Sequence, residues 1–232
     1  MFKHKKHLFF DLDHTLWDFE YNAKECLKEI YDDFKIVMLG PSFEDFYQKF
    51  STINRSLWTQ LEQELITHET IRKLRFQKVL SALHVDIQED LSTAMNLRLL
   101  DLLPHKTKLI DGSLEVLNAL KPNYELHILS NGYAEVQAKK LESSGIKGYF
   151  QHVVTNDIAN SRKPDLGIFN YALSLTTSKP NESLMIGDSY LADILGAKKA
   201  GWDTIHFQPI NIDTENQSTL KINKLVQLLD HL

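Results

Sequence analysis

The chain has 232 residues, of which 43% are hydrophobic and 25% are charged, and its formal net charge is -5. This composition is that of an ordinary globular protein, so disorder is not expected. Binding to a nucleic-acid polymer is disfavoured because the net charge leaves no broad basic surface for phosphate contacts. Cys26 is the single cysteine, and no apolar run is long enough to span a bilayer. We therefore expect a cytoplasmic protein without a disulfide or a membrane segment.

The first half of the chain predicts one strand followed by a long helical stretch. An apolar run over residues 7–10 leads directly into Asp11, Asp13 and Thr15. From residue 17 to residue 103 apolar side chains recur at three- and four-residue spacing, which is typical of helices. Four helices are expected there, and the last runs over residues 88–102 and stops before Pro104. Short polar residues suited to capping precede the other three: Asp18, Ser42 and Thr67.

From about residue 108 onward the pattern changes to short apolar strands that alternate with helices. Strands are predicted at 126–129, 153–154, 184–186 and 204–207. The predicted helices lie around 114–120, ahead of Gly145, from Pro164 onward, over 192–200 and over the tail, 220–232. This alternation predicts an α/β fold with a parallel sheet that is covered on both faces. We expect a sheet domain made of residues 1–16 and 105–232, with the helical stretch 17–104 inserted as a candidate lid.

The predicted strands end in polar residues that can carry chemistry. Because the carboxyl ends of parallel strands lie at one edge of a sheet, these residues can meet although they are far apart in sequence. They are Asp11, Asp13, Ser130, Asn131, Lys163, Asp188 and Asp193.

The charges of these residues point to a metal ion. In an extended chain, residues two apart face the same side, so Asp11 and Asp13 are expected to share one small volume. Together with Asp188 and Asp193 they carry a charge of -4, and Lys163 reduces this to -3. A closed site cannot hold that charge without a cation. Carboxylate oxygens are the ligands that Mg²⁺ prefers, and a bound Mg²⁺ lets a dianionic phosphate approach.

Roles in phosphoryl transfer follow from this arrangement. Asp11, held ionised, is the expected nucleophile toward phosphorus, and Asp13 is the expected general acid and base. Ser130 and the backbone N–H groups around Asn131 are expected to bind the phosphoryl oxygens, and Lys163 to neutralise their charge.

The segment Asp11-Leu12-Asp13-His14-Thr15, with Ser130, Lys163-Pro164 and Gly187-Asp188 followed by Asp193, resembles the four ordered motifs of the haloacid dehalogenase-like hydrolase superfamily. The resemblance implies a Rossmann-like core, an all-helical cap and an aspartyl-phosphate intermediate. It also implies that Asp11 and Asp188 bind Mg²⁺ through their side chains and Asp13 through its backbone carbonyl. Asp193 would help to hold the metal's waters, and Thr15 would support the phosphate loop. The branch that cleaves carbon–halogen bonds lacks an aspartate at the position of Asp13, so phosphoryl chemistry is favoured.

The insert also resembles the cap of a bacterial pyrimidine 5'-nucleotidase branch in residues 54–58, 66–67 and 72–76. Trp17 and Trp58 could then stack on a base, and Arg55 or Arg72 could meet its polar edge. The alternative is that the tryptophans are core residues and that the arginines pair at the surface. His14 could touch the leaving group or serve as a structural imidazole.

The expected function is Mg²⁺-dependent hydrolysis of a small-molecule phosphate ester, specifically a nucleoside 5'-monophosphate. A phosphosugar phosphatase or mutase fits the same core motifs. A phospho-receiver signalling domain also combines acidic residues, a phosphorylated aspartate and a lysine, but it has no large helical insert. The sequence predicts no oligomeric state.

Overall fold

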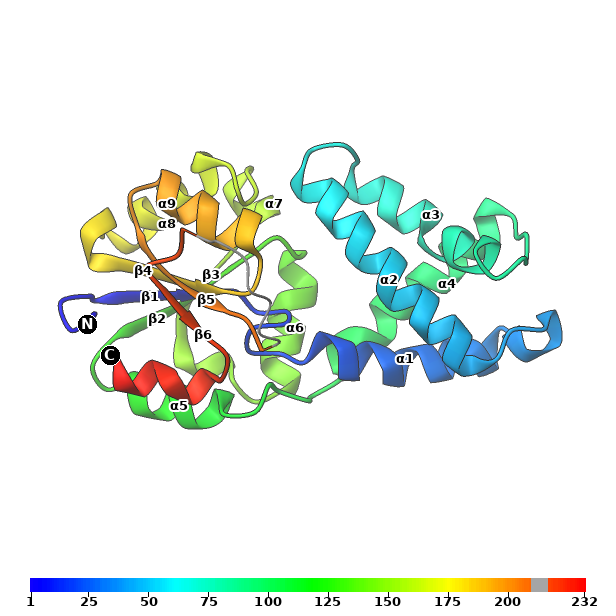
Figure 1. Cartoon of the computed structure of the whole chain (residues 1–232), viewed down its shortest axis with the longest axis horizontal. Coiled ribbons are helices and arrows are strands. Elements are labelled where there is room, and N and C mark those ends of the chain that lie inside the picture. The colour runs from blue at the N-terminus through cyan, green and yellow to red at the C-terminus, as the bar shows by residue number, and fades with distance from the viewer. Residues whose placement is uncertain (210–216) are drawn as a thin grey trace. The chain divides into compact units, whose positions relative to one another are not determined.

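The computed structural model describes residues 1–209 and 217–232. The chain divides into two compact units (Figure 1). We call Met1–Phe19 with Thr107–Leu232 the sheet unit and Glu20–Lys106 the helical unit.

The sheet unit is built on six parallel strands in the order β3-β2-β1-β4-β5-β6 (Figure 1). The strands are β1 (His7–Phe10), β2 (Glu125–Ser130), β3 (Phe150–Thr155), β4 (Ser183–Gly187), β5 (Asp203–Phe207) and β6 (Leu220–Ile222). All four residues of β1 are buried, because β1 is paired on both edges and covered on both faces. The predicted α/β fold with a Rossmann-like parallel sheet is confirmed.

Helices cover both faces of this sheet. They are α5 (Ser113–Leu120), α6 (Ala134–Ser143), α7 (Asn156–Ala159), α8 (Leu166–Thr176), α9 (Gly196–Lys199), a π-helical segment (Tyr190–Leu195) and a 3-10 helix (Leu225–Asp230). In Figure 1, α5 and the 3-10 helix lie on one face, and α8 and α9 lie on the other. On the second face Phe9 and Met185 pack with Phe169 and Trp202 in a fully apolar cluster. Burial of these apolar side chains stabilises the unit.

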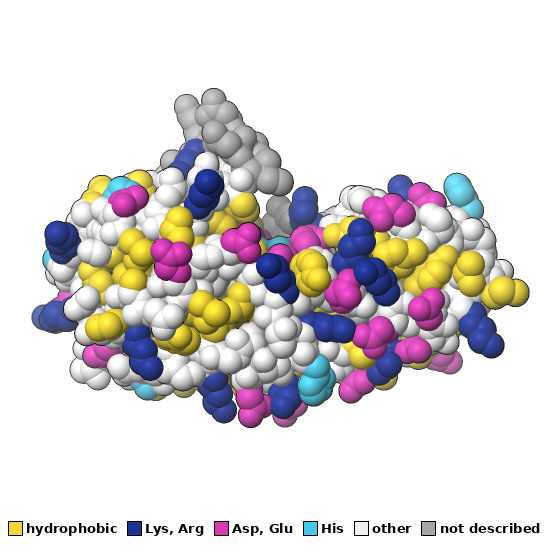
Figure 2. All heavy atoms as spheres, turned by 90° about the horizontal axis from the view of Figure 1, so that it is seen from below, with side chains coloured by type: hydrophobic (Ala, Val, Ile, Leu, Met, Phe, Trp, Pro, Cys, Tyr) yellow, Lys and Arg dark blue, Asp and Glu magenta, His cyan; other side chains and the backbone are white. Residues whose placement is uncertain are grey.

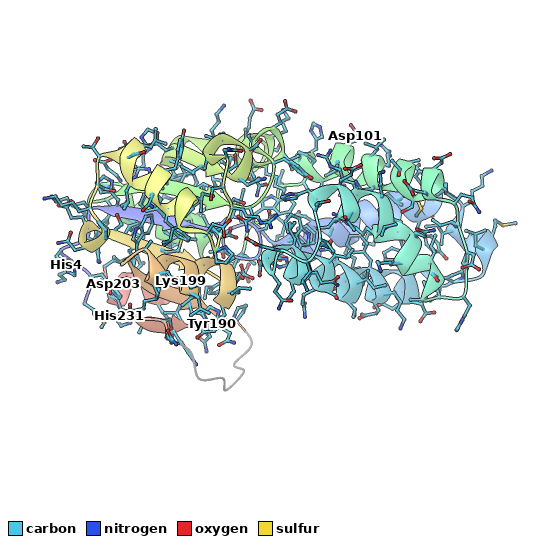
Figure 3. All side chains as sticks on the ribbon, turned by 90° about the horizontal axis from the view of Figure 1, so that it is seen from above. His4, Asp101, Tyr190, Lys199, Asp203 and His231 are labelled. Atoms are coloured by element: carbon cyan, nitrogen blue, oxygen red, sulfur yellow. The ribbon has the colours of Figure 1, made fainter. Side chains whose placement is uncertain are left out.

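The strand order reverses at β1, which has β2 on one side and β4 on the other. In open parallel sheets a ligand crevice forms outside the carboxyl ends of the strands at such a reversal. The N-terminal lead-in to β1 is fixed by buried Lys5, whose Nζ lies 2.7 Å from Oδ2 of Asp203 (labelled in Figure 3) and donates to the carbonyl of Asn181. The loop after β1 therefore starts from a rigid strand.

The tail differs from its prediction as one helix over 220–232. Leu220–Ile222 is the edge strand β6, which pairs with β5: Leu220 lies opposite Ile205, and Ile222 lies opposite Phe207. The exposed Lys221 between two less exposed apolar residues has the two-residue period of an edge strand, which the helical interpretation overlooked. Helical structure begins only at Leu225.

The helical unit contains α1 (Phe19–Asp33, whose first residue belongs to the sheet unit), α2 (Phe43–Glu62), α3 (His68–Ser81) and α4 (Glu89–Leu102). The predicted caps at Ser42 and Thr67 are confirmed: their side-chain oxygens accept from the backbone N–H groups of Asp45 and Thr70 at 3.1 Å and 3.2 Å. At the surface of this unit, the Arg98 side chain donates to Asp33 and to Asp101, which is labelled in Figure 3.

No helix in the described parts of the chain is long and apolar enough to cross a membrane. On the face shown in Figure 2, blue and magenta side chains are interspersed. The described side chains on this face form no large basic patch of the kind that binds nucleic acid.

Three histidine rings stack across the sheet. The rings of His7 and His127 are 5.5 Å apart, and those of His127 and His152 are 5.4 Å apart. His127 is fully buried, and burial, followed by the neighbouring rings of His7 and His152, lowers its pKa to about 3. The fold therefore holds His127 as a neutral imidazole.

This neutral histidine makes stability fall in acid. The unfolded chain takes up a proton on His127 near pH 6.5 and the folded chain does not until about pH 3. The stabilising contribution is therefore complete above pH 6.5 and is lost as the pH falls below it, by about 2 kcal/mol at pH 5. Denaturant unfolding of the wild type and of His127→Leu at pH 8 and pH 5 measures this pH-dependent loss of stability. The wild type should lose about 2 kcal/mol more than the variant between these pH values, and equal losses would contradict the assignment.

Candidate active site

The loop after β1 turns sharply and separates the two aspartates. The Leu12 carbonyl accepts hydrogen bonds from the backbone N–H groups of residues 15, 16 and 17. His14 adopts a left-handed conformation with a φ of 62°. The charge of Asp13 contributes to the raised pKa of Asp11, so the two aspartates lie in one region, but their carboxylates have different partners because the chain leaves the extended conformation after Phe10. Asp11 contacts Lys163, whereas Asp13 contacts Lys140.

Lys163 is the cationic centre of the site, and it is 2% exposed. Its Nζ donates to Asp11 Oδ1, to Asp193 Oδ1 and to the Leu129 carbonyl, each at 2.6 Å. Burial alone would lower the pKa of Lys163, but the charges of Asp11 and Asp193 raise it above its ordinary value. All three ammonium hydrogens are therefore used by the protein, and Lys163 stays charged.

Asn131 fixes the backbone of Lys163 from the end of β2. Its side-chain Nδ2 donates to the Lys163 carbonyl at 2.8 Å, and its Oδ1 accepts from the Lys163 N–H at 2.8 Å. The Asn131 side chain thus joins two strand ends, so its predicted part in phosphate binding rests on its backbone N–H.

Three carboxylates meet beside this lysine. Oxygen atoms of Asp11, Asp188 and Asp193 all lie within 4.8 Å of one another. Burial, followed by the charge of Asp193, raises the pKa of Asp11 to about 7. Burial and the charges of Asp11 and Asp193 also raise the pKa of Asp188 well above its ordinary value. The group therefore carries more negative charge than the protein alone offsets.

This donor set fits a hard divalent cation. With every carboxylate ionised, the three aspartates and Lys163 carry a formal charge of -2, since Asp13 is paired separately with Lys140. This corrects the value of -3 expected from the sequence, which placed all four aspartates against one lysine. A divalent cation would bring the group to neutrality, and three carboxylates with room for water are ligands that suit Mg²⁺.

The loop after β4 is shaped around Asp193. Asp193 Oδ2 accepts from the Ser189 N–H at 2.9 Å, and a Cβ at Gly187 would overlap the Asp193 carboxylate. The Thr15 hydroxyl donates to Asp188 Oδ1 at 3.3 Å. Thr15 thereby links the loop after β1 to the loop after β4.

Ser130 presents a hydroxyl with defined polarity. Its Oγ accepts hydrogen bonds from the Gly132 N–H at 3.1 Å and from Gln137 Nε2 at 2.8 Å. A hydroxyl oxygen has two lone pairs, so both are used and the hydroxyl hydrogen is left to donate. Ser130 is therefore set to bind an anionic oxygen.

The four residues predicted to contact a substrate lie in different surroundings. The His14 ring packs against Phe19, with 4.9 Å between centroids. Trp17 is fully buried, and the Lys140 ammonium lies 4.5 Å from its ring centroid. Trp17 is therefore a core residue, as the alternative expected, and its buried ring has no face open for stacking on a base.

Arg55 and Trp58 both lie on α2 in the helical unit. Arg55 is exposed and lies 3.6 Å from Glu20, and Trp58 packs edge-on against His68. Both remain predictions as substrate contacts.

Two buried polar residues of α6 were not predicted. Gln137 is fully buried and Lys140 is 3% exposed, and both donate to the Asp13 carboxylate. The available signal was their spacing of three residues, which puts them on the face that also buries Leu141.

The fold and this site agree with the comparison to known protein families. The chain matches the haloacid dehalogenase-like hydrolases over residues 8–207, and it belongs to that family.

Among individual relatives, the chain is 29% identical to the pyrimidine 5'-nucleotidase PynA of Streptococcus pneumoniae over 231 residues, which is 98% of this chain and 94% of PynA. It is 28% identical to the pyrimidine 5'-nucleotidase YjjG of Escherichia coli over 85% of this chain and 83% of YjjG. It is also 29% identical to a glyceraldehyde 3-phosphate phosphatase of Methanothermobacter thermautotrophicus, over 86% of this chain and 84% of that protein.

A solved structure of the HAD-hydrolase YfnB from Bacillus subtilis, bound to magnesium, superposes with a TM-score of 0.87. The two chains are 28% identical, and the match covers 98% of each.

The repulsion among the three carboxylates should lower the free energy of unfolding when no metal is bound. Asp188→Asn removes one of three mutually repelling charges, the one that is only partly buried, and keeps an oxygen for the Thr15 hydroxyl. In the presence of a chelator it should raise the free energy of unfolding by about 1 kcal/mol, and it should abolish the stabilisation of the protein by Mg²⁺. Thermal unfolding with chelator and with Mg²⁺ measures both, with the exposed Asp230→Asn as the matched control. A variant less stable than wild type in chelator would contradict the proposed repulsion.

Proposed function

We propose that this protein is a Mg²⁺-dependent phosphomonoesterase that forms an aspartyl-phosphate on Asp11 and acts on nucleoside 5'-monophosphates. The observation that carries the proposal is the buried group in which Lys163 bonds Asp11 and Asp193 while Asp188 lies within reach of both. Membership of the hydrolase family and the similarity to two pyrimidine 5'-nucleotidases support the same function.

In this proposal Asp11 and Asp188 would hold Mg²⁺ with their side chains, Asp13 would hold it with its backbone carbonyl, and Asp193 would help to hold the metal's waters. When bound, Mg²⁺ supplies positive charge that allows a dianionic phosphate to approach the carboxylates. The helical unit, Glu20–Lys106, serves as the cap of the hydrolase, and the sheet unit serves as its core.

The first chemical step transfers the phosphoryl group to the protein. An oxygen of the Asp11 carboxylate attacks phosphorus, and the bond between phosphorus and the leaving oxygen breaks. The electron pair stays on that oxygen, which takes a proton from the Asp13 carboxyl group. The Ser130 hydroxyl and the Asn131 N–H donate to the phosphoryl oxygens, and Lys163 opposes their charge.

The second step returns the protein to its starting state. A water oxygen attacks phosphorus while the Asp13 carboxylate takes the water's proton, and the bond between phosphorus and Asp11 breaks. Phosphate leaves, Asp11 is again a carboxylate and Asp13 is again protonated. The presence of Asp13 favours this chemistry over carbon–halogen cleavage, and the family match favours hydrolysis over the phospho-receiver alternative.

Activity should depend on both the metal and Asp11. Phosphate release by the purified protein should require Mg²⁺ and stop on full chelation. Asp11→Asn should lower kcat/KM by about a thousandfold or more, because no other group replaces the nucleophile. Asp230→Asn is the matched control and should behave as wild type. Activity that survives complete metal removal, or persists in Asp11→Asn, would contradict the mechanism.

The substrate class is tested by a panel of phosphate esters. Pyrimidine nucleoside 5'-monophosphates should show kcat/KM values at least about tenfold above those of sugar and triose phosphates. The relative that is a glyceraldehyde 3-phosphate phosphatase makes phosphosugar hydrolysis the second candidate. A preference for triose or sugar phosphates would overturn the nucleotide assignment and leave the phosphatase assignment intact.

A further inference from the structure

Lys140 is a buried cation for which the chemistry above has no use. It lies on α6, is 3% exposed, and its Nζ donates to Asp13 Oδ1 at 2.6 Å and to Oδ2 at 2.9 Å. The aromatic ring of Trp17 lies beside the ammonium, 4.5 Å from centroid to nitrogen. Both carboxylate oxygens of Asp13 are therefore held by one group that is itself confined by its neighbours.

Gln137 ties the same carboxylate to the phosphate-binding end of β2. Its Nε2 donates to Asp13 Oδ2 at 2.9 Å and to Ser130 Oγ at 2.8 Å. The amide can take this position only because residue 132 is glycine, since a Cβ there would overlap the Gln137 side chain. One amide therefore fixes the spacing between Asp13 and Ser130.

The need for a stable fold does not explain why Lys140 is buried against Asp13. Buried ion pairs are often no more stabilising than apolar side chains of similar volume, because desolvation offsets their attraction. Lys140 and Gln137 do, however, fix the position and the plane of the Asp13 carboxylate. An ionised carboxylate offers about four acceptor positions, and Lys140 and Gln137 fill three of them. One position on Oδ1 is left for proton exchange.

We propose that Lys140 and Gln137 are positioning residues that hold the Asp13 carboxyl group where it exchanges a proton with the leaving oxygen and then with water. The proposal rests on the proposed phosphatase function. After Asp13 has given its proton to the leaving oxygen, Lys140 also offsets the charge of the carboxylate that remains. Lys140 acts through Asp13, and Gln137 acts through Asp13 and Ser130.

The test separates the two chemical steps. With p-nitrophenyl phosphate the leaving group needs no proton, whereas attack by water on the aspartyl-phosphate still needs Asp13 as base. Lys140→Met should therefore release about one equivalent of p-nitrophenolate in a rapid burst. Steady-state turnover should fall about 30-fold to 100-fold, since a well-placed acid–base group contributes about 10²–10⁴. KM should fall with it and kcat/KM should stay nearly unchanged, because only the hydrolysis of the aspartyl-phosphate is slowed. Rapid-mixing absorbance measures the burst and the turnover together.

Three comparisons make the result specific. Lys140→Arg should recover turnover to within about fivefold of wild type, because a guanidinium reaches both oxygens of a carboxylate. Lys139→Met is the matched control, since Lys139 lies on the same helix, is exposed and pairs with Glu142, and it should leave turnover unchanged. In an Asp13→Asn background Lys140→Met should cost less than about twofold further, because both changes remove the same interaction.

Three results would overturn the proposal: unchanged turnover in Lys140→Met, an additive loss in the double variant, or equal losses in the burst and in turnover. If Lys140→Met does not fold, Lys140→Gln applies the same test, because it also removes the charge while keeping a polar side chain beside Asp13. Failure of the proposed function itself is distinct, because wild type would then release no phosphate in a metal-dependent way.

Discussion

The arrangement of this site depends on the repulsion among Asp11, Asp188 and Asp193, which a single ammonium offsets only in part. Lys163 bonds two of them directly, at 2.6 Å, and the third lies within 4.8 Å of both. The raised pKa values of Asp11 and Asp188 express the remaining repulsion. A fold tolerates such a cluster where it serves binding or catalysis, and the rest of the structure compensates for its cost.

The sheet provides that compensation. Asp11 follows a central strand that is buried on both sides, and its N–H donates to the Ile186 carbonyl of β4, which fixes the start of the acidic loop. Asn131 joins the end of β2 to the backbone of Lys163 through two hydrogen bonds. The charged groups are thus held by short connections to rigid strands, which preorganises them for a ligand.

Much of this could be predicted from the sequence because strand topology is simple. Lys163 lies 152 residues after Asp11, yet both follow short apolar strands, and parallel strands place such ends together. The partners of Asp13 were missed because Gln137 and Lys140 look like solvent-exposed residues of an amphipathic helix. The sharp turn at Leu12 was also missed, because an alternating pattern indicates an extended chain and carries no signal of where the strand ends. The edge strand at 220–222 was also missed, because three residues are too few to distinguish the two-residue period of a strand from the period of a helix.

Two different lysines pair with the aspartates of this site. Lys163 serves Asp11 and Asp193, and Lys140 serves Asp13. This separation keeps the proposed nucleophile and the proposed proton-transfer group from competing for one cation. It also assigns different chemistry to two aspartates that are only two positions apart in sequence.

The central claim is that Asp11 carries the phosphoryl group during turnover, and trapping the intermediate tests it most directly. The protein is mixed with Mg²⁺ and substrate, quenched in acid within the first turnover, digested and analysed by mass spectrometry. The account predicts one added phosphoryl group on the peptide that contains Asp11, absent when Mg²⁺ is omitted. Turnover with no phosphorylated peptide, or with the phosphoryl group on a different residue, would contradict it.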